Sequence, residues 1–154
     1  MIDLTQLTQA FVATIQAIPE VPAYLANQDT ANIVGYLDAN PVPFSIKRAV
    51  YEMPAGSVLV AFEETNFNDR AEEGMSMFQH RYFLYLRCAP GTSGLAMVNA
   101  VVNGIPTGKS QRWRFCPVMD GVLPTNLLGV SRAADSEGID YFALLTETPE
   151  IGDA

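Results

Sequence analysis

A short segment rich in glycine, residues 104–110 (GIPTGKS), comes nearest in this chain to a motif with chemistry of its own. A lysine and a hydroxyl after two glycines is typical of loops that bind nucleotide phosphates, but the Walker pattern has four residues between its glycines and this segment has three. A phosphate-binding loop also leads into a helix whose free N–H groups meet the anion, whereas residues 111–116 alternate like a strand. We interpret the segment as a helix end followed by a turn, without a nucleotide.

Cations and an aromatic residue alternate directly after this turn, in Lys109, Arg112, Trp113 and Arg114. Such a pattern can stack bases and neutralise phosphates. On a strand, however, Arg112 and Arg114 lie on one face and Trp113 on the other, which favours the aromatic ring as core and the arginines as an exposed pair. In a chain this acidic, we expect Arg112 and Arg114 to pair with carboxylates of a neighbouring subunit.

Candidates for catalysis and metal binding are few. His80 is the only histidine, so metal sites and nucleophile sites that need a second imidazole are excluded, and a structural role is favoured. The carboxylates Asp69, Glu72 and Glu73 lack the spacing of a calcium loop and fit a solvated loop better. We therefore predict no catalytic residue, no metal and no cofactor, and a protein that is not an enzyme.

Composition and charge further limit the classes of protein to which the chain could belong. The chain has 154 residues, of which 49% are hydrophobic and 17% charged, as expected for one domain with its own core, residues 1–154. No apolar run reaches the length of a membrane span, and two cysteines, Cys88 and Cys116, suit a reducing compartment. The net charge of −8 argues against general affinity for nucleic acid, because such binding depends on cations that replace phosphate counterions. We expect a cytoplasmic protein without membrane contact.

Hydrophobic spacing predicts an N-terminal helix over residues 3–18. Apolar residues recur there at steps of three and four, Asp3 and Gln6 form a capping-box pattern, and Pro19 ends it. Residues 33–36 form a short apolar patch that is either an edge strand or a connector. A second helix is predicted over residues 95–102. The apolar stripe of the first helix consists of Leu4, Leu7, Phe11, Ile15 and Ile18.

Strand patterns fill most of residues 44–148. The predicted strands are 45–53 and 58–62, joined as a hairpin by the turn 54–57, then 77–88, 111–119, 127–133 and 139–148. Between them, residues 65–75 form a long polar loop that we expect to be mobile until it meets a neighbour, and residues 149–154 form a short tail. The resulting fold class is α+β, with a mostly antiparallel β-sheet packed against two or more helices.

The last predicted strand is apolar on both faces, with Tyr141 on one face and Phe142 and Leu144 on the other. One face must pack on the helices of the domain, and the other needs either further cover from the same chain or a neighbouring subunit. We favour the neighbour. The candidate subunit interface therefore consists of Arg70, Glu72, Glu73, Arg112, Arg114, Tyr141, Phe142 and Leu144.

Three segments carry a resemblance to a known class of protein: residues 45–61 (SIKRAVYEMPAGSVLVA), 79–87 (QHRYFLYLR) and 135–142 (DSEGIDYF). In size, element order and these phrases, residues 44–150 resemble small structural proteins of the neck or tail of tailed bacteriophages, most closely the tail terminator, or tail completion, family. The resemblance implies a homo-oligomer, a hexameric ring that ends the tail tube and joins it to the head connector. DNA would pass through the lumen without specific binding, and the protein would be part of the virion after assembly in the host cytoplasm.

Two other classes remain open on the sequence alone. A head-closure or neck adaptor subunit would share the fold and the lack of an active site but lie on the portal side. A small cytoplasmic ligand-binding protein or enzyme would instead carry a pocket between its helices and its sheet.

Overall fold

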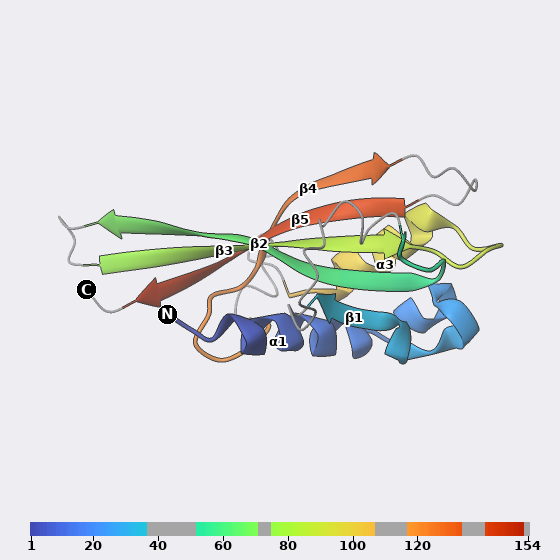
Figure 1. The fold of residues 1–154 in the computed structure, drawn as a ribbon, viewed down its shortest axis with the longest axis horizontal. Coiled ribbons are helices and arrows are strands. Elements are labelled where there is room, and N and C mark those ends of the chain that lie inside the picture. The colour runs from blue at the N-terminus through green and yellow to red at the C-terminus, as the bar shows by residue number, and fades with distance from the viewer. Residues whose placement is uncertain (37–51, 71–74, 107–116, 134–140, 153–154) are drawn as a thin grey trace.

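The computed structural model describes residues 1–36, 52–70, 75–106, 117–133 and 141–152 (Figure 1). These residues form a mixed fold of helices and one sheet, which confirms the predicted α+β class. Three short 3-10 helices, η1 to η3, connect the first helix to the first strand. The elements are α1 (Leu4–Gln16), η1 (Val21–Tyr24), η2 (Ala26–Gln28), η3 (Thr30–Asn32), β1 (Ile33–Tyr36), β2 (Ser57–Arg70), β3 (Met75–Arg87), α3 (Gly94–Gly104), β4 (Asn126–Ala133) and β5 (Tyr141–Gly152).

The five described strands form one sheet in the order β1-β2-β3-β5-β4. Only β1 runs parallel to its neighbour, β2, and the other three pairings are antiparallel. The last strand, β5, therefore lies between β3 and β4. Toward one end of the molecule β2, β3 and β5 extend beyond the helices as a three-stranded arm (Figure 1).

The N-terminal helix forms as its sequence predicts. The carboxylate of Asp3 accepts hydrogen bonds from the backbone N–H groups of Thr5 and Gln6, which satisfies two otherwise unpaired donors at the helix start. The helix ends at Gln16, close to the predicted end before Pro19. Of its apolar stripe, Leu7, Phe11 and Ile15 are fully buried, and Leu4 is partly buried.

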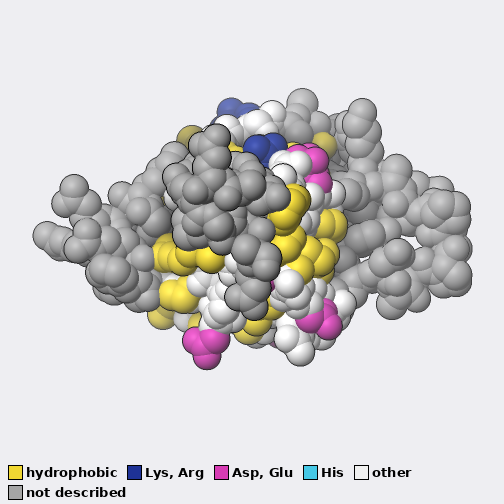
Figure 2. Space-filling model, turned by 90° about the vertical axis from the view of Figure 1, so that its left-hand side faces the viewer, with side chains coloured by type: hydrophobic (Ala, Val, Ile, Leu, Met, Phe, Trp, Pro, Cys, Tyr) yellow, Lys and Arg dark blue, Asp and Glu magenta, His cyan; other side chains and the backbone are white. Residues whose placement is uncertain are grey.

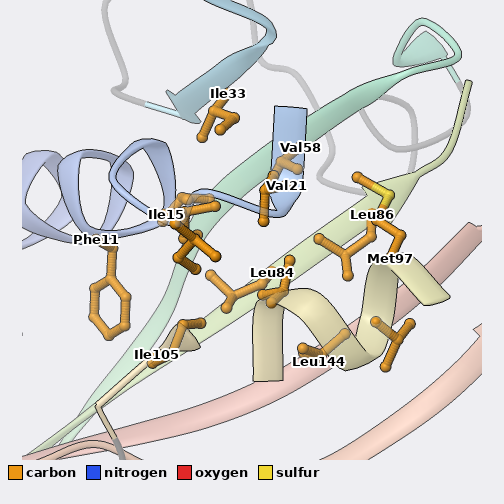
Figure 3. Packing of buried hydrophobic residues seen from close by; sticks show 14 of the residues in the cluster. Phe11, Ile15, Val21, Ile33, Val58, Leu84, Leu86, Met97, Ile105 and Leu144 are labelled. Carbon is orange, nitrogen blue, oxygen red and sulfur yellow. The ribbon is translucent and has the colours of Figure 1, made fainter. Parts of the chain in front are cut away.

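Both helices pack on the same face of the sheet and enclose the core between them and the strands (Figure 3). From the sheet, Leu84, Leu86 and Leu144 point into this core, and from α3 Met97 does so. The ring centroids of Phe11 and Tyr82 lie 4.8 Å apart. The even-numbered residues of β3 and β5 thus form the helix-covered face, as the two-residue period of a strand requires.

The predicted polar loop over residues 65–75 is wrong in its first half. Residues up to Arg70 continue β2 and pair with β3, down to Arg70 opposite Met75. The composition is polar, but Thr65 lies opposite His80 and Phe67 opposite Phe78, so cross-strand pairs stabilise the strand despite weak strand propensity. Residues 71–74 lie outside the described part.

The predicted C-terminal tail is also wrong, because β5 continues through Pro149 to Gly152. Proline has no N–H to donate within a sheet. This is tolerated at Pro149 because β5 pairs with β4 only up to Glu147. The carbonyl of Pro149 still accepts a bond from the N–H of Leu123.

Most other predicted elements are confirmed. Residues 58–62 lie in β2, 77–87 in β3, 127–133 in β4 and 141–148 in β5, the helix over 95–102 is α3, and residues 33–36 are the edge strand β1. The hairpin predicted between 45–53 and 58–62 is wrong, because residues 58–61 pair with β1 on one side and with β3 on the other, and Glu52 and Met53 are not in a strand. Residues 45–51, 111–116 and 139–140 lie outside the described part, so the strand structure predicted there stays a prediction. Residues 117–119 are not in a strand.

Gly56 should be among the positions least tolerant of a side chain. Its φ is +76°, and a Cβ built there would lie 2.4 Å from the backbone nitrogen of Ala26. We expect Gly56→Ala to lower the free energy of unfolding by more than the ~1–3 kcal/mol of left-handed strain alone, because backbone atoms cannot move aside as a side chain can. Urea unfolding of the purified variant measures this.

Gly91 provides the matched control. Its φ is +81°, but nothing lies within 4 Å of a Cβ built there. Gly91→Ala should therefore show the backbone strain without the clash. Equal losses in the two variants would contradict the close approach at Gly56.

Candidate functional site

The three apolar residues of the predicted interface lie in β5 and are all buried within the chain itself. Tyr141 is 5% exposed, Phe142 4% and Leu144 0%. Phe142 and Leu144 belong to the core under the helices, and Tyr141 lies on the opposite face, next to Arg87 in the pairing of β3 with β5. On the face of Tyr141, however, Ala143 and Leu145 are only half-buried. A contact role for these residues stays a prediction.

Of the charged members of the predicted interface, only the backbone of Arg70 lies in the described part of the chain. Arg70 is the last residue of β2, with its backbone opposite Met75. Glu72, Glu73, Arg112 and Arg114 lie outside the described residues, so their predicted contacts with a neighbour remain predictions.

A buried polar cluster at the base of the arm was not foreseen from sequence. His80, fully buried, lies with Nε2 2.7 Å from a carboxylate oxygen of Glu150, and its Nδ1 lies 2.8 Å from the hydroxyl of Thr65. The same carboxylate accepts a hydrogen bond of 2.8 Å from the backbone N–H of Ile2. With Glu150 ionised and His80 neutral, Nε2–H donates to the carboxylate and Nδ1 accepts from Thr65.

This cluster stabilises the fold through hydrogen bonds between distant segments of the chain. A buried carboxylate is costly unless hydrogen bonds satisfy it, and here Glu150 has donors from both His80 and Ile2. It therefore joins the N-terminal segment, the arm and the C-terminal strand. The sequence prediction that His80 is structural agrees with this placement. Glu150 carried no signal, since its partners are 70 and 148 residues away in the chain.

Tyr82 is a second buried polar anchor between the sheet and α1. Its hydroxyl lies 2.9 Å from that of Thr8 and donates to the carbonyl of Leu4 at 3.1 Å. Burial raises the pKa of Tyr82 above 10.0, and the hydrogen bond with Thr8 partly offsets the rise. The phenol is thus held neutral as a structural link.

The arm itself exposes apolar side chains. Phe67 is 58% exposed and packs at 5.2 Å, between ring centroids, on Phe78, while Ile151 is 54% exposed on the opposite face. Figure 2 views this end of the molecule and shows hydrophobic side chains at the surface beside acidic ones. The arm also carries two acidic side chains, Glu64 and Glu147, which both form ion pairs with Arg81.

A second exposed region follows the two edges of the sheet. At one edge, α1 and β1 border an open groove of about 260 Å³ that includes Gln9, Ala13 and Ile33. At the other edge, Leu128 and Val130 of β4 are 43% and 47% exposed. The space between α3 and the sheet is much smaller, about 10 Å³, so that part of the helix–sheet interface offers no room for a ligand.

The described residues form neither a metal-ligand cluster nor a helix that could cross a membrane. Within the described ranges, no three histidine, cysteine, aspartate or glutamate side chains gather as metal ligands. No helix in the same part of the chain combines the length and hydropathy that crossing a bilayer requires.

Comparison with known proteins places the fold. No protein-family description matches the chain, and no curated protein matches its sequence. Among solved structures, the chain is similar to a protein chain in the virion of a native gene transfer agent particle. The two are 13% identical, with a TM-score of 0.52 over 95% of each chain. At this identity the likeness concerns the fold, and it extends over nearly the whole of both chains.

Proposed function

We propose that this protein is a structural subunit of a phage-like virion and not an enzyme. The observation that carries the proposal is the shared fold with a chain of a gene transfer agent virion, over 95% of both chains. Two features of the described structure support a structural role. The buried polar groups join elements of the fold, and exposed apolar side chains lie on the arm and the sheet edges. Such exposed patches are typical of surfaces that contact other proteins.

Within that class, we propose the role of a tail terminator, a hexameric ring that ends the tail tube and joins it to the head connector. The sequence resemblance over residues 44–150 favours this position. The net charge of −8 suits a channel that DNA must pass without binding. A head-closure or neck adaptor subunit is the alternative, and it differs in the partner that the ring binds.

Light scattering after size-exclusion chromatography tests the ring, since six copies give a mass six times the subunit's 16.8 kDa. Electron micrographs of the protein mixed with purified tail tubes then test the position. Rings at tube ends support the terminator, whereas rings that bind only the head connector support the adaptor. A chain that stays monomeric at every concentration and binds neither particle would contradict a virion role.

A further inference from the structure

The two edges of the sheet carry a pattern that suggests how copies of the chain meet. Because β1 and β4 are the outermost described strands, each pairs with another described strand along one side only. Strand edges invite pairing with another chain unless charge or cover prevents it. Val34 on β1 and Val130 on β4, each 47% exposed, add apolar surface at both edges.

Both edges lack acidic residues, a property that they share with other described elements such as α3. The sequences of α1 and β1 contain no charged residue, and that of β4 contains none that is acidic and one cation, Arg132. The chain as a whole carries −8, so two copies repel each other wherever their carboxylates meet. A contact between copies is least opposed where both surfaces lack acidic groups. The arm does not meet this condition, since Glu64 and Glu147 lie on it.

The groove between α1 and β1 is large enough to hold a few side chains of another protein chain. Its volume of about 260 Å³ is below the ~300–1,000 Å³ of usual small-molecule sites. Val12 and Ile33 give it an apolar floor, and the uncharged Gln9 and Gln16 border it. Aliphatic side chains such as those of β4 match this lining.

We propose that the occupant of this groove is β4 of a second copy, so that the β4 edge of one subunit packs on the α1–β1 edge of the next. The two surfaces are different and lie at opposite edges of one sheet, which makes the contact head-to-tail. Contacts of this kind repeat around an axis and close into a ring when the rotation allows. The inference rests on the proposed ring and names the surfaces that build it.

Variants with one damaged edge test the proposal. Ala13→Glu places a carboxylate in the groove, and Val130→Glu places one on β4, both at solvent-accessible positions. Each should raise the protein concentration needed for ring formation by at least about tenfold, because every contact would then bury a carboxylate against a largely apolar surface. Leu95→Glu, at a 58% exposed position of α3, is the control and should assemble as the unaltered chain does.

Mixing the variants makes the test specific for a head-to-tail contact. An Ala13→Glu chain keeps an intact β4 edge and a Val130→Glu chain an intact groove, so an equimolar mixture should form dimers that neither variant forms alone. Sedimentation velocity measures all samples, and thermal melting confirms folding. If either substitution unfolds the chain, Gln9→Glu, which changes charge at nearly constant shape, replaces Ala13→Glu, and Leu128→Glu replaces Val130→Glu.

The outcomes separate this inference from the proposed function. Two results would overturn the β4–groove contact while the unaltered chain still forms rings. In the first, both edge variants form rings as well as the unaltered chain does. In the second, the variants are monomeric both alone and in mixture. An unaltered chain that is monomeric at all concentrations would overturn the ring and this contact together.

Discussion

A chain with Phe142→Asp is expected to be unfolded. Phe142 is 4% exposed in the core under the helices, and an aspartate there would bury a charge among apolar side chains such as Leu84 and Leu144. A charge buried on this apolar face costs several kcal/mol in addition to the lost burial of the ring and its lost contact with the Arg132 guanidinium, against a total stability of only about 5–15 kcal/mol for a domain. Circular dichroism and solubility of the purified variant measure the result.

Tyr141→Asp on the opposite face of the same strand should also destabilise strongly, because Tyr141 is 5% exposed. Ile151→Asp is the matched control, since Ile151 lies on the same face of the same strand but is 54% exposed. We expect its unfolding free energy to change by at most about 0.5 kcal/mol, as for other exposed sites. A Tyr141→Asp chain as stable as Ile151→Asp would show that a neighbouring subunit, and not the chain itself, covers this face.

His80→Leu is expected to lower the free energy of unfolding by about 1–3 kcal/mol. The substitution keeps an apolar volume but removes the donor at 2.7 Å from the Glu150 carboxylate, which then retains the N–H of Ile2 but has lost its partner from the sheet. Urea unfolding monitored by tryptophan fluorescence and circular dichroism measures the loss.

A second substitution separates the charge from the packing. In the His80→Leu background, Glu150→Gln removes the carboxylate charge while its side-chain carbonyl can still accept from the N–H of Ile2. This double variant should therefore be more stable than His80→Leu alone. A loss below about 1 kcal/mol for His80→Leu, or no recovery in the double variant, would contradict an ionised Glu150 held by His80.

The sequence predicted those parts of the fold that depend on local periodicity. The stripe of Phe11 and Ile15 defined α1, and the dense aliphatic and aromatic run around Leu84 defined β3. Where a residue's state depends on a partner far along the chain, the prediction failed. Asn66 and Asn68 indicate a loop by type, but pairing with β3 makes them strand.

The candidate site was less predictable for the same reason. Two apolar faces on β5 were correctly foreseen, yet the sequence gives no measure of how much cover the rest of the chain supplies to Tyr141. The proposed interface instead rests on the exposed and uncharged residues at the two edges of the sheet. Which strands form these edges depends on the strand order. No local pattern places the last strand between β3 and β4.

That strand order also determines when the protein can fold during its synthesis. Because β5 is made after β4 yet lies between β3 and β4, β4 has no described strand to pair with until β5 has been synthesised. The hydrogen bond from Ile2 to Glu150 closes a loop of 148 residues, so the start of the first helix is anchored only when β5 is present. Such long-range closure slows folding and leaves strand edges exposed meanwhile. The described sheet can thus be completed only once β5 has been made.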